Sequence, residues 1–135
     1  MAHRIVFVNG CFDVLHRGHI ELFEFAKSHG EYLIVALDTD ERVKQQKGEK
    51  RPFNSLTDRQ KVVSSIKYVD WVDSFSTDEE LIALVRQASP DVMIVGSDWR
   101  GKTVIGSQYA KEIKFFERID GYSTTNILQD SPHRR

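Results

Sequence analysis

The sequence predicts one α/β domain built on a doubly wound sheet of five parallel strands. Short, nearly continuous apolar runs alternate along the chain with segments whose apolar residues recur at helical spacing. This alternation indicates right-handed βαβ units of the Rossmann-like kind. A chain of 135 residues suits a single domain. We place that domain at residues 1–130 and a short C-terminal tail at 131–135.

Five segments are predicted as strands because they are apolar runs that contain β-branched residues. In chain order they are residues 4–8, 32–37, Trp71–Phe75, 92–95 and, with a weaker pattern, 113–116. Parallel strands of a doubly wound sheet bind ligands outside their carboxyl ends. Functional residues are therefore expected directly after these runs.

Three segments between the strands are predicted as helices. After Gly18, apolar residues recur at positions 20, 23, 25 and 26, and the segment 56–69 carries them at 62, 63, 66 and 69. A third apolar stripe at positions 81, 84 and 85 is closed by Pro90. These helices supply the crossovers that parallel strands require.

The composition excludes several classes of protein. Apolar residues make up 40% and charged residues 29%, and the net charge of −1 gives no general attraction to nucleic acid. Cys11 is the only cysteine, so neither an internal disulfide nor a zinc site built on several cysteines can form. The longest apolar run is far too short to cross a bilayer, and the first residues lack a secretory signature. We expect a cytoplasmic enzyme or binding domain without nucleic-acid or membrane partners.

A cationic segment follows the second predicted strand. Residues 40–54 contain five basic side chains around Gly48, namely Arg42, Lys44, Lys47, Lys50 and Arg51. Two interpretations are open. The segment is either an ordinary solvated loop or a mobile cationic flap over a polyphosphate.

The first predicted strand leads into the motif NGCFDVLHRGH at residues 9–19. Gly10 allows a tight turn off the strand. His16 and His19 are three residues apart at the start of a helix and share one face, and Gly18 lets a phosphate approach the backbone. Free N–H groups at that terminus favour anions, and two imidazoles suit a phosphate oxygen that gains charge. A zinc site formed by the two histidines and Asp13 is the alternative, but no third histidine or second cysteine lies at a recognisable spacing.

A second motif, RIDGYSTTNI, occupies residues 118–127. Gly121 suits a turn and Ser123 suits a helix N-cap. The segment is either an ordinary capped helix or a second helix N-terminus that offers N–H and hydroxyl groups to phosphates, with Arg118 adding charge.

The two motifs, in this order and spacing, resemble the cytidylyltransferase-like family of nucleotidyltransferases over about residues 4–128. The resemblance implies a transfer of a nucleoside monophosphate from a nucleoside triphosphate to a phosphorylated small molecule, with release of pyrophosphate. It also implies Mg²⁺ held mainly by the nucleotide phosphates, with no metal-binding protein side chain assigned, and a homodimer in which residues 54–75 pack across a two-fold axis.

Site residues are carried over from this resemblance in three groups. Those expected to stabilise the triphosphate are His16, His19, Lys47 and Arg118. Those expected to bind the nucleotide are Gly10, Cys11, Phe12, Asp13, Gly18, Asp98, Trp99, Gly121, Ser123 and Thr124. Those expected at the acceptor are Asp40, Arg59 and Lys67.

Two branches of the family share features with this chain. The segment SDWRGK at residues 97–102 and Arg118 resemble glycerol-3-phosphate cytidylyltransferases. The segments KGEKRPFNSLTDR and YVDWVDSF, together with Gly106-Ser107, resemble heptose-1-phosphate adenylyltransferases. Because base selectivity follows local contacts, we expect CTP and a small polyol or sugar phosphate. The alternative is ATP with a heptose 1-phosphate.

A further segment imitates a different nucleotide site. Residues 96–103, GSDWRGKT, match the Walker A pattern by letter and follow a predicted strand. The position at the fourth strand and the acidic Asp98 within the loop speak against a P-loop NTPase. A non-catalytic nucleotide-binding module is the other alternative, which tight nucleotide binding without pyrophosphate release would reveal.

Overall fold

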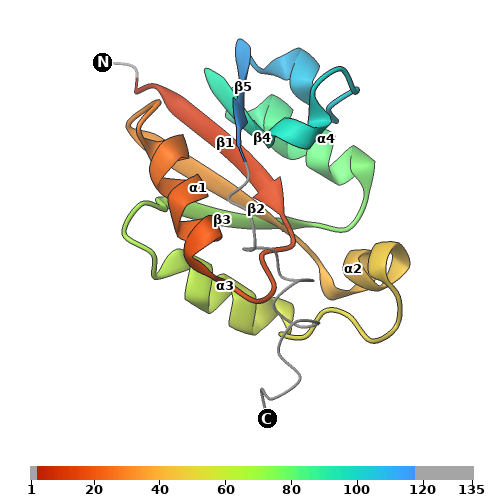
Figure 1. Ribbon diagram of the computed structural model, residues 1–135. Helices are drawn as coiled ribbons and strands as arrows, with labels where there is room; N and C mark the ends of the chain where they lie inside the picture. Colours follow the sequence, from red (N-terminus) through yellow and green to blue (C-terminus); the bar gives the residue numbers. More distant parts are fainter. Residues whose placement is uncertain (1–2, 118–135) are drawn as a thin grey trace.

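Five parallel strands form one sheet in the order β3-β2-β1-β4-β5 (Figure 1). The structure is a computed structural model and describes residues 3–117. The chain builds outward from β1 to β2 and β3, then returns to place β4 on the other side of β1. The strand order therefore reverses between β1 and β4, where a doubly wound sheet forms its ligand crevice. The predicted fold class is confirmed.

The five predicted strands and the three predicted helices are present, and one further helix follows the second strand. They are β1 (Ile5–Gly10), α1 (Arg17–Lys27), β2 (Tyr32–Asp38), α2 (Asp40–Lys47), α3 (Leu56–Ser64), β3 (Trp71–Phe75), α4 (Asp78–Ala88), β4 (Val92–Gly96) and β5 (Glu112–Phe116), with 3-10 turns η1 (Ser97–Trp99) and η2 (Ser107–Tyr109). The helix predicted over 56–69 ends earlier, because Ser65, Ile66 and Val69 donate to carbonyls only three residues back.

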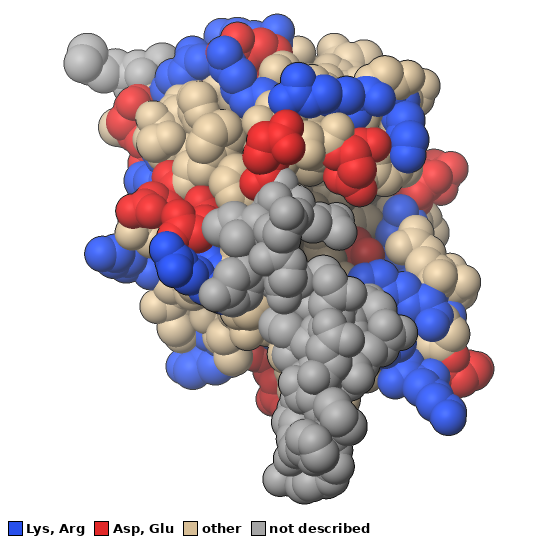
Figure 2. Space-filling view, in the orientation of Figure 1, with Lys and Arg blue, Asp and Glu red and all other residues tan. Residues whose placement is uncertain are grey.

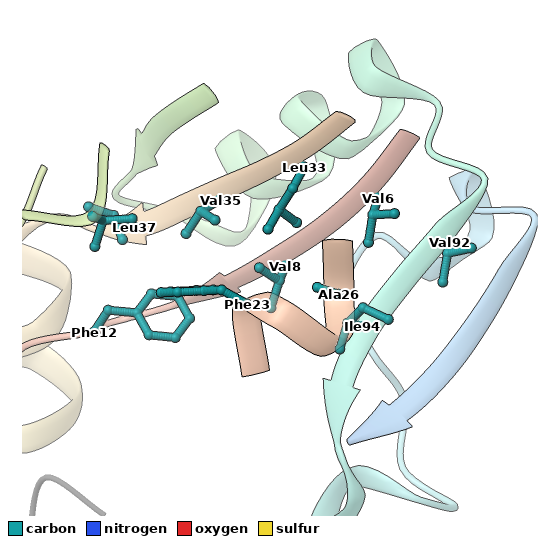
Figure 3. Packing of buried hydrophobic residues seen from close by; sticks show 11 residues of the cluster. Val6, Val8, Phe12, Phe23, Ala26, Leu33, Val35, Leu37, Val92 and Ile94 are labelled. Carbon is teal, nitrogen blue, oxygen red and sulfur yellow. The ribbon is translucent and has the colours of Figure 1, made fainter. Parts of the chain in front are cut away.

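The sheet is covered on both faces, which explains the nearly continuous apolar strands. Alternate residues of the central strands, including Val6, Val8 and Ile94, point toward α1 and meet Phe12 and Phe23 there (Figure 3). The intervening residues form a second cluster against α4, made of Phe7, Ala36, Phe75, Leu81, Val85 and Met93. Both clusters stop at the carboxyl ends of the strands, where polar residues take over.

The surface shown in Figure 2 mixes basic and acidic side chains, in keeping with the near-neutral net charge. No helix among residues 3–117 is long and apolar enough to span a membrane.

Candidate functional site

A pocket of about 520 Å³ opens at the carboxyl ends of β1, β2 and β4. Its size lies within the range of small-molecule sites. The β1–α1 loop forms its centre, the segment after β4 forms one side, and the end of β2 with α2 forms the other. Of the residues expected to contact ligands, nine line it, namely Gly10, Cys11, Phe12, Asp13, His16, Gly18, His19, Asp98 and Trp99, and Lys47 joins them from α2.

The two histidines are held by the first turn of α1. His16 is the N-cap, and its Nδ1 accepts a hydrogen bond from the Gly18 N–H at 3.0 Å. The Nδ1 of His19 accepts one from the His16 N–H at 3.2 Å. The two rings thus form a reciprocal capping box, with ring centroids 4.0 Å apart.

This cap also determines where each ring carries its proton. An Nδ1 atom that accepts a hydrogen bond cannot bear a proton, so a neutral ring has it on Nε2. In each neutral imidazole the donor atom is therefore Nε2–H. Donors of this kind stabilise charge that builds up on phosphate oxygens.

Phe12 fixes the loop between β1 and these histidines. Its backbone lies in the left-handed region, with φ of 49°. Its ring packs on Phe23 at 5.0 Å and meets His19 edge-on at 5.5 Å between centroids. A Cβ at Gly10 would come within 3.0 Å of the Phe12 ring, so the absence of a side chain there lets the ring enter the core.

The β4 side of the pocket carries Asp98 and Trp99 in η1. Trp99 is 44% exposed and lies beneath Lys102, whose Nζ is 5.7 Å from the ring centroid. From Gly96 the chain enters this 3-10 turn and not an α-helix. A Walker A loop leads into a helix whose N-terminus binds phosphate, so the structure lacks the arrangement that the letter pattern imitates.

The α2 side differs from the loop expected over residues 40–54. Thr39 caps a helix there by accepting from the Arg42 N–H, and α2 extends to Lys47 before Gly48 turns away with φ of 101°. This helix has no apolar stripe in the sequence, because Val43 is its single buried residue. Lys47 nevertheless lines the pocket, as expected of a phosphate-binding cation.

Arg59 does not reach the pocket as an acceptor-binding residue would. It is 1% exposed, and its guanidinium donates to the carbonyl oxygens of Asn54, Cys11 and Asp38 at 3.0, 2.9 and 2.7 Å. It also bonds the carboxylate of Asp40 at 2.7 Å. Burial and these four hydrogen bonds make Arg59 a brace between the loops after β1 and β2.

Asp13 forms the second brace of the β1–α1 loop. Its carboxylate accepts from the backbone N–H groups of Phe53 and Asn54, and the Asn54 side chain donates back to the Asp13 carbonyl at 2.9 Å. The Asp13 side chain therefore holds the loop before α3 against the histidine loop. It thereby orients the site, and because Asp13 also lines the pocket, its expected contact with the nucleotide stays a prediction.

Two other residues expected at the acceptor lie elsewhere. Asp40 is engaged by Arg59 and is not among the pocket-lining residues. Lys67 lies in the turn between α3 and β3, with its Nζ 5.2 Å from the Tyr68 ring centroid. Asp70, three residues further on, exchanges hydrogen bonds with Leu33 near the start of β2, so this turn lies at the amino ends of the strands, away from the pocket. Arg118, Gly121, Ser123 and Thr124 lie outside the described residues, and their roles stay predictions.

Four polar residues that line the pocket were not among the site residues predicted from the sequence, namely Asn9, Asp38, Arg42 and Gln46. Asp38 directly follows the predicted strand 32–37, and functional residues are expected at that position, so the sequence did contain a signal for it. Burial raises the pKa of its carboxyl, against the opposing charges of Arg42, Lys47 and Arg59. Burial likewise raises the pKa of the Cys11 thiol, which keeps it protonated and weakly nucleophilic.

No group of three or more His, Cys, Asp or Glu residues that could hold a metal ion is found among residues 3–117.

Comparisons with known proteins agree with this architecture. A family model described as cytidylyltransferase-like matches residues 7–130. The chain is 43% identical over 124 residues to the bifunctional protein HldE of Campylobacter fetus subsp. fetus, covering 92% of this chain and 27% of that protein. It is 44% identical over 128 residues to the protein of the same name from Wolinella succinogenes, covering 95% and 27%. The chain thus spans about a quarter of the length of these curated relatives.

Solved structures share the fold. The lipopolysaccharide core biosynthesis protein from Thermoplasma volcanium superposes with a TM-score of 0.68 at 22% identity, covering 88% of this chain and all of that one. A pantothenate synthetase from Thermus thermophilus gives a TM-score of 0.61 at 14% identity, over 86% of this chain and 56% of that one.

Proposed function

The chain belongs to the cytidylyltransferase-like family, and from this premise we propose that its pocket catalyses nucleotidyl transfer between a nucleoside triphosphate and a phosphorylated sugar. The observation that carries the proposal is the histidine capping box, which holds two imidazoles in the pocket wall at the switch point of a doubly wound sheet. Pyrophosphate is the second product.

The reaction proposed is a direct in-line displacement. An oxygen of the acceptor phosphate attacks the α-phosphorus, a new P–O bond forms, and the bond to the β-phosphate bridging oxygen breaks. The acceptor phosphate is ionised at neutral pH, so the step needs no protein nucleophile. His16 and His19 donate to phosphate oxygens as charge develops, and Lys47 adds a positive charge from α2. Mg²⁺ bound by the nucleotide phosphates would supply further charge neutralisation.

For the substrates we propose ATP and a heptose 1-phosphate. Asp98, Trp99 and Arg118 led us to expect CTP and a polyol phosphate. The two curated relatives above, both named HldE and 43–44% identical to this chain, instead support the adenylyltransferase branch of the resemblance. The resemblance of residues 97–102 to cytidylyltransferases is confined to one short segment, whereas the similarity to the HldE proteins extends over nearly the whole chain.

A pyrophosphate-release assay tests the proposal. The four nucleoside triphosphates are crossed with heptose 1-phosphate, mannose 1-phosphate and glycerol 3-phosphate. We expect release to be fastest with ATP and heptose 1-phosphate. Preference for CTP with glycerol 3-phosphate would return the assignment to the cytidylyltransferase branch. No acceptor-dependent release with any pair would refute nucleotidyl transfer.

Variants of the histidines test the mechanism. His16→Ala or His19→Ala should lower kcat by about two to three decades, since each removes one charge-stabilising donor. His29→Ala is the matched control, because His29 follows the far end of α1 and packs on Phe25 outside the pocket. Turnover close to wild type in both site variants would exclude the histidines from catalysis.

A further inference from the structure

One carboxylate in the pocket wall has no evident role in folding. Asp38 ends β2, is 8% exposed and lines the pocket. Its Oδ1 lies 3.9 Å from the Nε of Arg42, which is an ion-pair distance but too long for a hydrogen bond. Within residues 3–117 no group donates a hydrogen bond to this carboxylate. A buried carboxylate normally has such donors, and their absence points to a ligand that supplies them.

The energetics of Asp38 also argue against a structural role. Burial raises the pKa of its carboxyl in spite of three nearby cations. A raised pKa means that folding disfavours the charged form at neutral pH. The wild-type carboxylate therefore costs stability, which is typical of a residue kept for binding.

The neighbours of Asp38 define the chemistry of the ligand group. Asn9 and Asp38 point to the same face of the sheet, since Asn9 is paired with Ala36 and Asp38 lies two residues further along β2. Gln46 lines the same side of the pocket from α2. A carboxylate accepts only, whereas the two amides both donate and accept. Such a set matches hydroxyl groups, whereas Arg42 and Lys47 on the same side of the pocket match phosphate.

The position assigns these hydroxyl groups to one of the two substrates. Asp98 and Trp99, the expected nucleotide contacts, follow β4, whereas Asp38 and Gln46 lie beyond β2. The central strand β1 and its histidine loop separate the two sides. We propose that Asp38, together with Asn9 and Gln46, binds the hydroxyl groups of the acceptor, so that the acceptor is a polyhydroxylated sugar phosphate. This inference rests on the proposed nucleotidyl transfer and specifies its second substrate.

The test uses Asp38→Asn, which keeps the size of the side chain and removes the charge. We expect the KM for heptose 1-phosphate to rise about tenfold or more, as loss of a charged acceptor predicts. The KM for ATP should change by less than about twofold. The variant should also discriminate less than wild type against mono-deoxy analogues of the sugar. Its free energy of unfolding in urea should be equal to or higher than that of wild type.

Asp78→Asn is the matched control. Asp78 pairs with the same Arg42, at 2.8 Å from its guanidinium, but is not among the pocket-lining residues. It should leave the KM for heptose 1-phosphate unchanged. If Asp78→Asn reproduces the effect of Asp38→Asn, the carboxylate acts through Arg42 and the proposal fails.

The remaining outcomes separate this inference from the proposed function. An unchanged acceptor KM in Asp38→Asn, a raised KM for ATP in its place, or a loss of stability would each overturn the assignment of Asp38. If wild type shows no turnover, nucleotidyl transfer is refuted. The hydroxyl subsite is then tested separately, by measuring in a calorimeter how tightly wild type and Asp38→Asn bind heptose 1-phosphate. Equal binding by wild type and Asp38→Asn would then overturn the hydroxyl subsite as well.

Discussion

Replacing Arg59 by methionine should destabilise the protein strongly. The change keeps an unbranched side chain but leaves three carbonyl oxygens, those of Cys11, Asp38 and Asn54, and the Asp40 carboxylate without their donor. Each buried acceptor left unsatisfied costs about 1–3 kcal/mol, and breaking a buried ion pair costs about 3–5 kcal/mol. Because Asp40 is partly exposed and water can replace some donors, we expect a total of about 3–5 kcal/mol.

Urea denaturation followed by circular dichroism measures this loss. Arg17→Met is the control, since Arg17 forms an exposed pair with Glu21 at 3.3 Å and should cost less than about 0.5 kcal/mol. A loss below about 1 kcal/mol for Arg59→Met would refute the bracing role. If Arg59→Met leaves stability unchanged and raises the KM for the acceptor, the bracing role is also refuted. Arg59 would then be an acceptor-binding residue, as the sequence predicted.

Three further predictions concern other parts of the chain. Lys47→Ala should weaken ATP binding in calorimetry and reduce the protection that ATP gives residues 41–52 against protease; no nucleotide protection in wild type would favour a simple solvated helix. The pKa of Asp91 is lowered by the Ile5 N–H and by a neighbouring lysine, so its stabilising effect is present above about pH 4 and lost as the pH falls. Asp91→Asn should therefore flatten the acid limb of stability in urea titrations, and an unchanged limb would contradict this. The proposed homodimer should appear in light scattering and dissociate in Trp71→Lys, because Trp71 is 55% exposed on edge strand β3; a monomeric wild type at micromolar concentration would exclude it.

The strands were predictable because burial on both faces of the sheet requires nearly continuous runs of apolar residues. Leu33 and Val35 face α1 and α3 while Ala36 faces α4, so the run could contain few polar residues. The helix α2 has no comparable apolar pattern in the sequence. It lies beyond the sheet, buries Val43 alone, and is specified by the Thr39 cap and by contacts of Arg42 with Asp78 and Phe75. Contacts between distant segments cannot be read from a local pattern.

The site shows the same division between local and distant information. His16, Gly18 and His19 were identifiable because their spacing within one turn already sets their geometry. Arg59 was assigned to the acceptor because a cation near a phosphate-binding motif suggests a ligand. Its four partners come from residues 5 to 48 positions away. Burial decided its role, and burial depends on the assembled fold.

The histidine capping box makes the reactive part of the pocket transferable. Gly18 and His16 donate to the two rings, and the His19 N–H donates to the His16 carbonyl, so all three hydrogen bonds join atoms within residues 16–19. A protein engineer who needs two oriented imidazole donors can therefore graft this four-residue cassette onto the start of another helix. The braces at Asp13 and Arg59 cannot be moved in this way, because they depend on segments 41 and 48 residues distant in the chain.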